Sequence, residues 1–262
     1  MAPVFYGAMT MSEQICGFHA VEAALEQSPE RVTSLWLQAG RKDARMQALQ
    51  DQASALGVRV ERLPRDELDR RSRGVRHQGV LAEVNARPPA DLAGLLDHLD
   101  ALDHAPLLLV LDQVQDPHNL GALLRTAAAA GVDAVITPSD RSAGLTPVVR
   151  KTAAGAAERI LFVRVGNLAR ALDRLRERGV WLHGLAGQAD TALYAADLTG
   201  PIALVLGAEA SGLRRLTRDR CDALWRLPMA SGVESLNVSA AGAVALFEAV
   251  RQRQIAPGAA TP

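Results

Sequence analysis

The chain has 262 residues, of which 48% are hydrophobic and 22% are charged. This size and balance exclude a peptide hormone and a largely disordered chain, and they predict one large or two modest globular domains. Basic and acidic side chains are equal in number, 29 of each, so the chain as a whole has no net charge that would attract nucleic acid. Only local clusters of arginine could do so.

Three further absences narrow the class of protein. Cys16 and Cys221 lie too far apart in the sequence for a disulfide framework or a paired zinc site, which predicts a reduced, cytoplasmic protein. No basic segment precedes an apolar core at the start, and every apolar run is shorter than a ~20-residue membrane span, so we expect neither export nor a membrane. Each of the six histidines is interpreted as a surface or packing residue and not as a ligand, and we expect no metal.

The first part of the chain alternates helical and strand patterns and predicts a small α/β domain over residues 12–86. Helices are expected at 17–27, 42–57 and 65–72, and strands at 32–38, 58–63 and 77–84. The prolines of 85–91 (NARPPAD) break this pattern, because they fit neither a helix interior nor a central strand. We place the domain boundary there, with a linker and connecting helix over 87–104.

The second part, residues 105–254, alternates strands and helices again, and a tail follows at 255–262. Strands are expected at 107–114, 133–138, 161–165, 180–187, 202–207 and 223–229, and helices at 119–131, 147–160, 167–179, 211–221 and 235–253. The strands are near-continuous apolar runs, which predicts a parallel sheet covered by helices on both faces. Ligands bind at the carboxyl ends of the strands in such sheets. The common dinucleotide, P-loop and nucleophile-elbow motifs are absent.

The first polar segment that follows a strand is 112–131 (DQVQDPHNLGALLRTAAAAG). Asn119 is a candidate cap for the helix that begins after Asp116 and Pro117. Arg125 is the only charge in the apolar part of this helix, and a buried guanidinium needs a partner such as a phosphate. The alternative, an arginine on an exposed helix face, fits the pattern equally well.

The second segment is 202–216 (IALVLGAEASGLRRL). Gly207 ends a buried strand, where a missing side chain would let a ligand approach the backbone, and Ser211 with Gly212 looks like a helix start. Glu209 could simply be a favourable charge near a helix N-terminus, worth less than ~1 kcal/mol. That explanation leaves two glycines and an acid at one strand end unexplained.

The third segment is 227–247 (LPMASGVESLNVSAAGAVALF). Ser235 is a plausible helix cap, which places Asn237 and Ser239 in the first turn, where alanine would be favoured. Polar groups at a helix N-terminus suit an anion or a ribose. Helix-start chemistry alone explains Ser235 better than the other two residues.

Two arginine clusters, in residues 59–76 and 214–220, are candidates for contact with RNA phosphates. The alternative is a solvated helix face on which arginine is interleaved with aspartate and glutamate.

Together, the three polar segments resemble the three motifs of the SpoU (TrmH-type) RNA ribose 2'-O-methyltransferases of the SPOUT superfamily. The matching stretches are 116–127 (DPHNLGALLRTA), 204–213 (LVLGAEASGL) and 227–248 (LPMASGVESLNVSAAGAVALFE). Residues 16–84 resemble the substrate-binding domain that precedes the catalytic domain in one subgroup. Within the family, the chain is most similar to enzymes that modify a guanosine of 23S rRNA.

The resemblance implies an L30e-like RNA-binding domain, then a parallel-sheet α/β methyltransferase domain with a deep trefoil knot. It further implies S-adenosyl-L-methionine as methyl donor, 23S rRNA as partner and a homodimer. Catalysis and substrate placement are assigned to Asn119, Arg125, Glu209, Asn237 and Ser239. The donor is placed against the backbone around Gly207, Leu227 and Leu236.

A ribose hydroxyl must be positioned and must lose a proton to accept a methyl group. Arginine is no base because its pKa stays above ~12. We therefore expect Arg125 to hold a phosphate and favour negative charge on the oxygen, while Asn119 and Ser239 hold the hydroxyl. The proton acceptor and the subunit that completes each site are left open by the sequence.

Three alternatives accompany this hypothesis. One is 2'-O-methylation of another rRNA or tRNA position. Another is an RNA-binding ribosome-assembly factor without turnover, against which the joint presence of Glu209, Asn237 and Ser239 counts. The third is methylation of a small metabolite, which would need neither the first α/β domain nor the basic 59–76 stretch.

Overall fold

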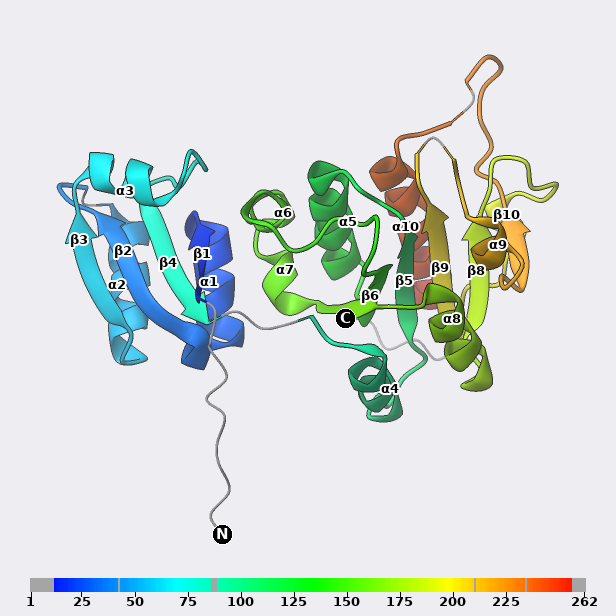
Figure 1. Cartoon of the computed structure of the whole chain (residues 1–262), viewed down its shortest axis with the longest axis horizontal. Coiled ribbons are helices and arrows are strands. Elements are labelled where there is room, and N and C mark those ends of the chain that lie inside the picture. The colour runs from blue at the N-terminus through cyan, green and yellow to red at the C-terminus, as the bar shows by residue number, and fades with distance from the viewer. Residues whose placement is uncertain (1–11, 42, 86–88, 210, 234, 256–262) are drawn as a thin grey trace, which may run out of the picture. The chain divides into compact units, whose positions relative to one another are not determined.

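The computed structural model describes residues 12–41, 43–85, 89–209, 211–233 and 235–255. The chain divides into two compact units between residues 88 and 89, and each unit has its own β-sheet (Figure 1). The expected tail lies outside the described residues except for Ile255, which ends the last helix.

The N-terminal unit contains a four-stranded sheet in the order β1-β4-β2-β3. Its strands are β1 (Ser12–Cys16), β2 (Val32–Gln38), β3 (Arg59–Leu63) and β4 (Val80–Asn85). Strand β4 runs antiparallel to β1 and β2, whereas β3 runs parallel to β2. The helical segments are α1 (Phe18–Gln27), η1 (Pro29–Arg31), α2 (Ala44–Ala55) and α3 (Arg65–Arg71).

Strand β1 is an element that the sequence patterns did not predict. Its residues SEQIC show no apolar alternation, and only Ile15 among them is buried. The strand lies at the edge of the sheet and is fixed by its pairing with β4. A local pattern cannot signal such a strand, because its partner lies about 70 residues away in the sequence.

Apolar side chains of the N-terminal unit pack on both faces of its sheet. Leu35 and Leu37 of β2 belong to the larger core with α1 and α2, whereas Trp36 between them joins Leu68 of α3 in a smaller cluster. Successive strand residues point to opposite faces, so one apolar run serves both cores.

The C-terminal unit contains a six-stranded, wholly parallel sheet in the order β10-β8-β9-β5-β6-β7 (Figure 1). Its strands are β5 (Leu107–Asp112), β6 (Ala134–Pro138), β7 (Leu161–Val165), β8 (Trp181–Leu185), β9 (Ile202–Gly207) and β10 (Ala223–Trp225). Its helical segments are α4 (Leu92–Asp100), α5 (Pro117–Ala129), α6 (Pro147–Ala153), α7 (Ala156–Arg159), α8 (Leu168–Glu177), η2 (Leu193–Ala195), α9 (Arg215–Arg218) and α10 (Val238–Ile255).

The central strand β5 shows why helices cover both faces of this sheet. Leu107, Leu109 and Leu111 belong to the core beneath α5, α6 and α10, whereas Leu108 and Val110 belong to the core with α4 and α8. All five side chains are buried. The predicted α/β class, with a parallel-sheet domain after a small α/β domain, is confirmed.

Two expected helices are shorter in the structure. The helix expected at 147–160 is divided into α6 and α7, because Ala154 and Gly155 adopt the left-handed conformation, with φ of 50° and 89°. The helix expected at 211–221 is reduced to α9, because residues 208 and 212 pair across a tight turn.

Candidate active site

The first two polar segments meet at the carboxyl end of the parallel sheet. Strands β5 and β9 are neighbours, and Asp112 at the end of β5 pairs in register with Gly207 at the end of β9. The segment leading into α5 and the turn after β9 therefore start from adjacent points. The third segment joins them because α10 packs against α5 and β9.

Asn119, Glu209 and Asn237, one from each segment, form a closed hydrogen-bonded network. The Asn119 amide Nδ2 donates to Glu209 Oε1 over 2.7 Å. The Asn237 amide Nδ2 donates to the same oxygen over 2.7 Å and to Asn119 Oδ1 over 3.0 Å. Asn119 is buried, whereas Glu209 and Asn237 are exposed. The network therefore faces solvent and is anchored by the buried Asn119.

Asn237 is also the residue that caps α10. Its Oδ1 accepts hydrogen bonds from the backbone N–H of Ser239 over 2.9 Å and from the Ser239 hydroxyl over 2.5 Å. The expectation that Ser235 caps this helix is therefore wrong, since the helix begins two residues later than that cap requires. One asparagine both starts the helix and joins the network.

Asn119 does not cap α5. Asp116 is the cap, and its side chain accepts from the His118 N–H over 2.9 Å, while Asn119 is the third residue of the helix. Because Asp116 already satisfies the helix start, the Asn119 side chain is left to reach the other two segments. The cap interpretation is wrong.

Gly207 is required by the fold of the following turn. A Cβ at this position would lie 2.1 Å from the backbone C of Gly212 and 2.3 Å from the N of Leu213. Gly212 itself has φ 64° and exchanges hydrogen bonds with Ala208, so no helix starts there. The missing side chain of Gly207 thus makes room for the chain's own backbone, in addition to any ligand.

A cavity of about 150 Å³ lies beside the network. Its wall comes from the loops after β8, β9 and β10 and from the start of α10, and it is mainly apolar. Gly207, Leu227 and Leu236, for which the resemblance implies donor contact, all line it, as does Glu209. The sequence analysis did not single out three other lining residues, namely Gly187, Trp225 and Met229.

An ion pair between the buried Asp112 and the exposed Arg214 holds the turn after β9 in place. Asp112 is fully buried, and its carboxylate accepts from the Arg214 Nε over 2.6 Å and from the Arg214 backbone N–H over 3.0 Å. Removing one partner of such a pair leaves a buried charge uncompensated. Sequence reasoning missed Asp112, although a carboxylate that ends an entirely apolar strand was the available signal.

Trp225 is held in the cavity wall by His183 of β8. The indole Nε1 donates to His183 Nδ1 over 2.9 Å, and the two rings are stacked at 6.0 Å. Burial lowers the pKa of His183, which favours the neutral ring that can accept this bond. His183 is therefore a structural support, as its apolar surroundings in the sequence suggest.

Arg125 lies apart from the network. It is exposed on α5, and across the described residues it takes part in none of the hydrogen bonds or ion pairs that join the other four residues. The sequence left a partnered and an exposed arginine open, and the structure has the exposed one. Its guanidinium is available to a ligand or to a second protein chain.

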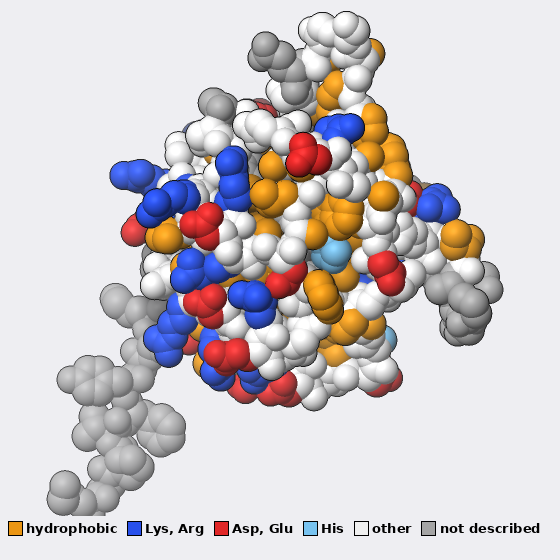
Figure 2. Space-filling view, turned by 90° about the vertical axis from the view of Figure 1, so that its right-hand side faces the viewer, with side chains coloured by type: hydrophobic (Ala, Val, Ile, Leu, Met, Phe, Trp, Pro, Cys, Tyr) orange, Lys and Arg blue, Asp and Glu red, His pale blue; other side chains and the backbone are white. Residues whose placement is uncertain are grey.

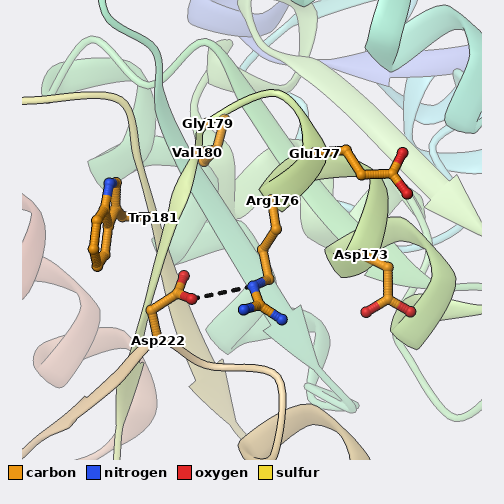
Figure 3. A pocket seen from close by; sticks show the side chains of 7 residues that line it. All are labelled: Asp173, Arg176, Glu177, Gly179, Val180, Trp181 and Asp222. Carbon is orange, nitrogen blue, oxygen red and sulfur yellow. Dashed lines mark ion pairs between the residues drawn. The ribbon is translucent and has the colours of Figure 1, made fainter.

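A larger cavity, of about 590 Å³, has a different character and contains none of the predicted site residues. Figure 3 shows that Asp173, Glu177 and Asp222 line it together with a single guanidinium, and that Arg176 faces Asp222. The ion pair between these two spans 3.1 Å. Three carboxylates against one arginine make this cavity unsuitable for an anion.

The 214–220 cluster supports the alternative of a solvated, mixed-charge face. Arg214 is paired with Asp112, and Arg220 with Asp173 over 3.0 Å. Figure 2 shows basic and acidic side chains interleaved on this side of the molecule, beside a group of hydrophobic ones. We therefore do not assign RNA contact to this cluster.

The described residues contain neither a candidate membrane-spanning helix nor a candidate metal site. No helix in them combines the length and apolarity needed to cross a lipid bilayer. No three histidine, cysteine, aspartate or glutamate side chains in them are grouped so that they could hold a metal ion.

Comparison with known proteins identifies the family. Residues 106–247 match the model of the SpoU rRNA Methylase family, and residues 14–90 match that of the RNA 2'-O ribose methyltransferase substrate-binding domain. The 23S rRNA (guanosine-2'-O-)-methyltransferase RlmB of Pseudomonas putida is 53% identical over 250 residues, which cover 94% of this chain and 99% of that protein. RlmB of Ralstonia nicotianae is 52% identical over 254 residues, covering 95% and 99%.

A solved structure shows the same fold over nearly the whole chain. The SpoU methyltransferase AviRb of Streptomyces viridochromogenes, crystallised with AdoMet, is 24% identical, covers 92% of this chain and is itself covered to 90%, with a TM-score of 0.78. The resemblance drawn from the three polar segments is thus confirmed. The chain belongs to the SpoU rRNA methylase family.

Proposed function

We propose that this protein transfers a methyl group from S-adenosylmethionine to the ribose 2'-hydroxyl of a guanosine in 23S rRNA. Relatives that carry this activity in their name are about half identical over almost all of the chain. The observation that carries the proposal is the network of Asn119, Glu209 and Asn237 beside an apolar cavity, because it sets hydrogen-bonding groups next to a site for an uncharged ring.

The cavity fits the donor by its chemistry. Leucine and tryptophan side chains suit an adenine ring and an alkyl chain. Leu227 and Leu236 belong to no helix or strand, and within the described residues their main-chain groups make no hydrogen bond to another backbone group, which leaves them for a ligand. S-adenosylmethionine supplies, when bound, a methyl group on a positively charged sulfur. We assign Gly207, Leu227 and Leu236 to holding it.

The polar network is suited to holding a ribose hydroxyl. The Ser239 hydroxyl donates its hydrogen to Asn237 Oδ1, so its lone pairs can accept a hydrogen bond from a substrate hydroxyl. Glu209 Oε1 already accepts from two amides, and we assign Glu209 to orienting Asn119 and Asn237. Holding the hydroxyl in one orientation removes much of the entropic barrier to transfer.

Arg125 is assigned to the RNA phosphate beside the target ribose. Its exposure leaves the planar guanidinium free for two parallel hydrogen bonds to phosphate oxygens. A fixed positive charge there would also favour the developing negative charge on the ribose oxygen. Arginine does not act as the base, because it stays protonated.

A homodimer is supported by apolar surface at the end of the chain. Val244 and Phe247 of α10 are 37% and 48% exposed, and Val233 and Leu236 before the helix are 50% and 40% exposed. Such a group of large apolar side chains marks an interaction surface. A second copy placed there would lie next to the cavity. Neither Cys16 nor Cys221 takes part in a disulfide among the described residues, which supports a cytoplasmic location.

We assign residues 12–86 to rRNA binding and residues 105–254 to methyl transfer, joined by 87–104. The match of 14–90 to a substrate-binding model supports the first assignment. Its independent core supports a separable role.

The direct test is transfer of tritiated methyl from S-adenosylmethionine to 23S rRNA that lacks its natural modifications. We expect incorporation at one guanosine, with an alkali-resistant linkage that marks a 2'-O-methyl group. Unmodified tRNA and 16S rRNA serve as controls. Incorporation into tRNA alone, or donor binding without transfer to any RNA, would overturn the proposed substrate.

A further inference from the structure

The N-terminal unit contains a cavity of about 560 Å³ with a strongly basic lining. The charged and aromatic residues that matter are Phe18, Arg41, Arg45, Arg65, Asp69 and Arg76. Four guanidinium groups and one carboxylate thus belong to the lining, and two of the four are also paired with carboxylates outside the lining. This charge ratio is the reverse of that in the large cavity of the C-terminal unit.

Two of the guanidinium groups are held in fixed positions by Phe18 and by carboxylates. The Arg45 guanidinium carbon lies 4.6 Å, and that of Arg41 5.6 Å, from the centre of the Phe18 ring. Arg45 is also paired with Glu22 over 2.8 Å and Arg41 with Asp43 over 2.5 Å. Arg41 further donates to the Gln78 carbonyl over 2.7 Å. Guanidinium planes fixed in this way lose little freedom when they bind an anion.

Of the other two basic groups, Arg65 has only a long ion pair and Arg76 has none among the described residues. Arg65 is 76% exposed and lies 3.9 Å from Asp69, which already accepts from His77 Nε2 over 2.8 Å. Arg76 is exposed and makes no hydrogen bond or ion pair with another described residue. Positive charge is thus concentrated on the side formed by Arg65 and Arg76.

The loop that carries Arg76 is built in an unusual backbone conformation. Arg73 and Gln78 have φ of 50° and 55°, although neither is glycine. His77 fixes the loop end, because its Nδ1 accepts from the Gly79 N–H over 3.0 Å. A Cβ on Gly79 would lie 3.0 Å from the Gln38 side chain and 3.4 Å from Arg41. The strained loop and the glycine bring Arg76 and Arg41 to one cavity.

Four arginines of the 59–76 cluster fall into two groups that differ in their contacts. Arg70 and Arg71 belong to ion pairs on α3, with Glu67 at 2.5 Å and 3.0 Å, and Arg71 also covers the Trp36 ring. They support the alternative of a solvated helix face. Arg65 and Arg76 instead line the cavity.

We propose that this cavity binds a backbone phosphate of the rRNA substrate, with Arg65 and Arg76 as the principal ligands and Arg41 and Arg45 as the fixed wall. The proposal rests on the proposed function for the identity of the RNA. A phosphate is favoured over a carboxylate-bearing partner because four guanidinium groups converge from different elements, which suits an anion with several oxygens. Its role is to select and hold rRNA, and it takes no part in the methyl transfer itself.

The test compares the full-length wild type with the double variant Arg65→Ala/Arg76→Ala and the control Arg70→Ala. The control removes the same kind of charge from the same region but leaves the cavity lining intact. Binding to an unmodified 23S rRNA fragment is measured over a series of salt concentrations. We expect the double variant to bind at least ~10-fold more weakly. The slope of the logarithm of the binding constant against the logarithm of the salt concentration should decrease in magnitude by about 0.7, the value for one phosphate contact on a single strand.

Two further measurements distinguish a folding defect of the double variant from loss of a phosphate contact. Unchanged S-adenosylmethionine affinity and melting temperature in the double variant would show that the fold is intact. Wild-type rRNA affinity in the double variant, or an equal loss in Arg70→Ala, would overturn the phosphate site. Because binding is measured without transfer, a wild type that binds rRNA through this cavity but never methylates it would overturn only the proposed function.

Discussion

The side-chain amide of Asn237 donates to the side-chain oxygen of Asn119 over 3.0 Å, although 118 positions separate the two residues. Both amides also donate to one oxygen of Glu209. Each asparagine sits at the start of a helix that leaves the carboxyl end of the parallel sheet. The network thus depends on where α5 and α10 begin, and a shift of either helix by one residue would open it.

Asn237→Ser separates the two roles of Asn237. Serine caps a helix about as well as asparagine, so the melting temperature should change little, but its hydroxyl lacks the amide that reaches Asn119 and Glu209. We expect turnover to fall about 100-fold, the loss typical of one oriented donor in an active site. Methyl transfer at saturating rRNA and donor measures it.

Asn167→Ser is the matched control for this substitution. Asn167 caps α8 by accepting from the Arg170 N–H over 3.0 Å, and it belongs to no comparable network. Stability and turnover should both stay near the wild type. Equal turnover in Asn237→Ser and Asn167→Ser would contradict the assignment of the network to catalysis.

Gly207→Ala should destabilise the C-terminal unit, whereas Gly187→Ala should not. Both glycines line the same cavity, but a Cβ at Gly207 collides with the backbone of Gly212, while a Cβ at Gly187 meets no atom within 4 Å. We expect Gly207→Ala to lower the free energy of unfolding by about 3 kcal/mol. Urea unfolding measures it, and equal stability of the two variants would refute the close approach.

Arg125→Ala should separate donor binding from rRNA methylation. Because Arg125 is exposed, its loss should change the free energy of unfolding by less than about 0.5 kcal/mol and leave S-adenosylmethionine affinity intact. We expect transfer to rRNA to fall at least ~100-fold. Arg170→Ala, an exposed arginine of α8, is the control. Lost donor affinity with intact single-turnover transfer would contradict the assignment to a phosphate.

Local patterns predicted the parallel sheet and the three polar segments, because apolar runs and polar strand ends are visible in the chain itself. Asn119 and Asn237 were identified by the family motif, yet their capping roles were misplaced. Several neighbouring polar residues could cap each helix, among them Asp116 for α5 and Ser235 for α10. Tertiary contacts decide which of them does so, and these contacts are not visible in the local sequence.

Close approaches between distant segments could not be predicted. The basic cavity of the N-terminal unit joins Arg41 and Arg45, which follow β2, to Arg65 and Arg76, which lie further along the chain. The sequence placed only the last two in an arginine cluster, and did not distinguish them from Arg70. Pairing of Arg70 with Glu67 is a matter of side-chain geometry.

Glu248 makes the stability of α10 depend on pH. Hydrogen bonds from Arg251 and Gln252 lower the pKa of this carboxyl to about 2 from its usual 4.5. A lowered folded-state pKa contributes stability that is complete above about pH 4.5 and is lost as the pH falls toward about 2. Glu248→Gln should therefore be less stable than the wild type at neutral pH, with a difference that vanishes in acid.

Urea unfolding of both proteins over this pH range checks the linkage. Arg251→Met removes the principal partner and should reproduce much of the neutral-pH loss. A stability difference between wild type and Glu248→Gln that stays constant from neutral pH down to about pH 2 would contradict the cause given for the lowered pKa.

Removal of residues 1–88 should separate rRNA selection from donor binding. The C-terminal unit has its own buried core on each face of its sheet, and the cavity that we assign to the donor lies within it, so S-adenosylmethionine affinity should persist. Preference for 23S rRNA over tRNA should fall sharply, because the basic cavity that we propose as a phosphate site is lost with the N-terminal unit. Competition between the two RNAs for methylation measures this preference. If the truncated protein still methylates the same single guanosine with an unchanged preference for 23S rRNA over tRNA, then the C-terminal unit selects the substrate. The N-terminal arginines would then have a different function.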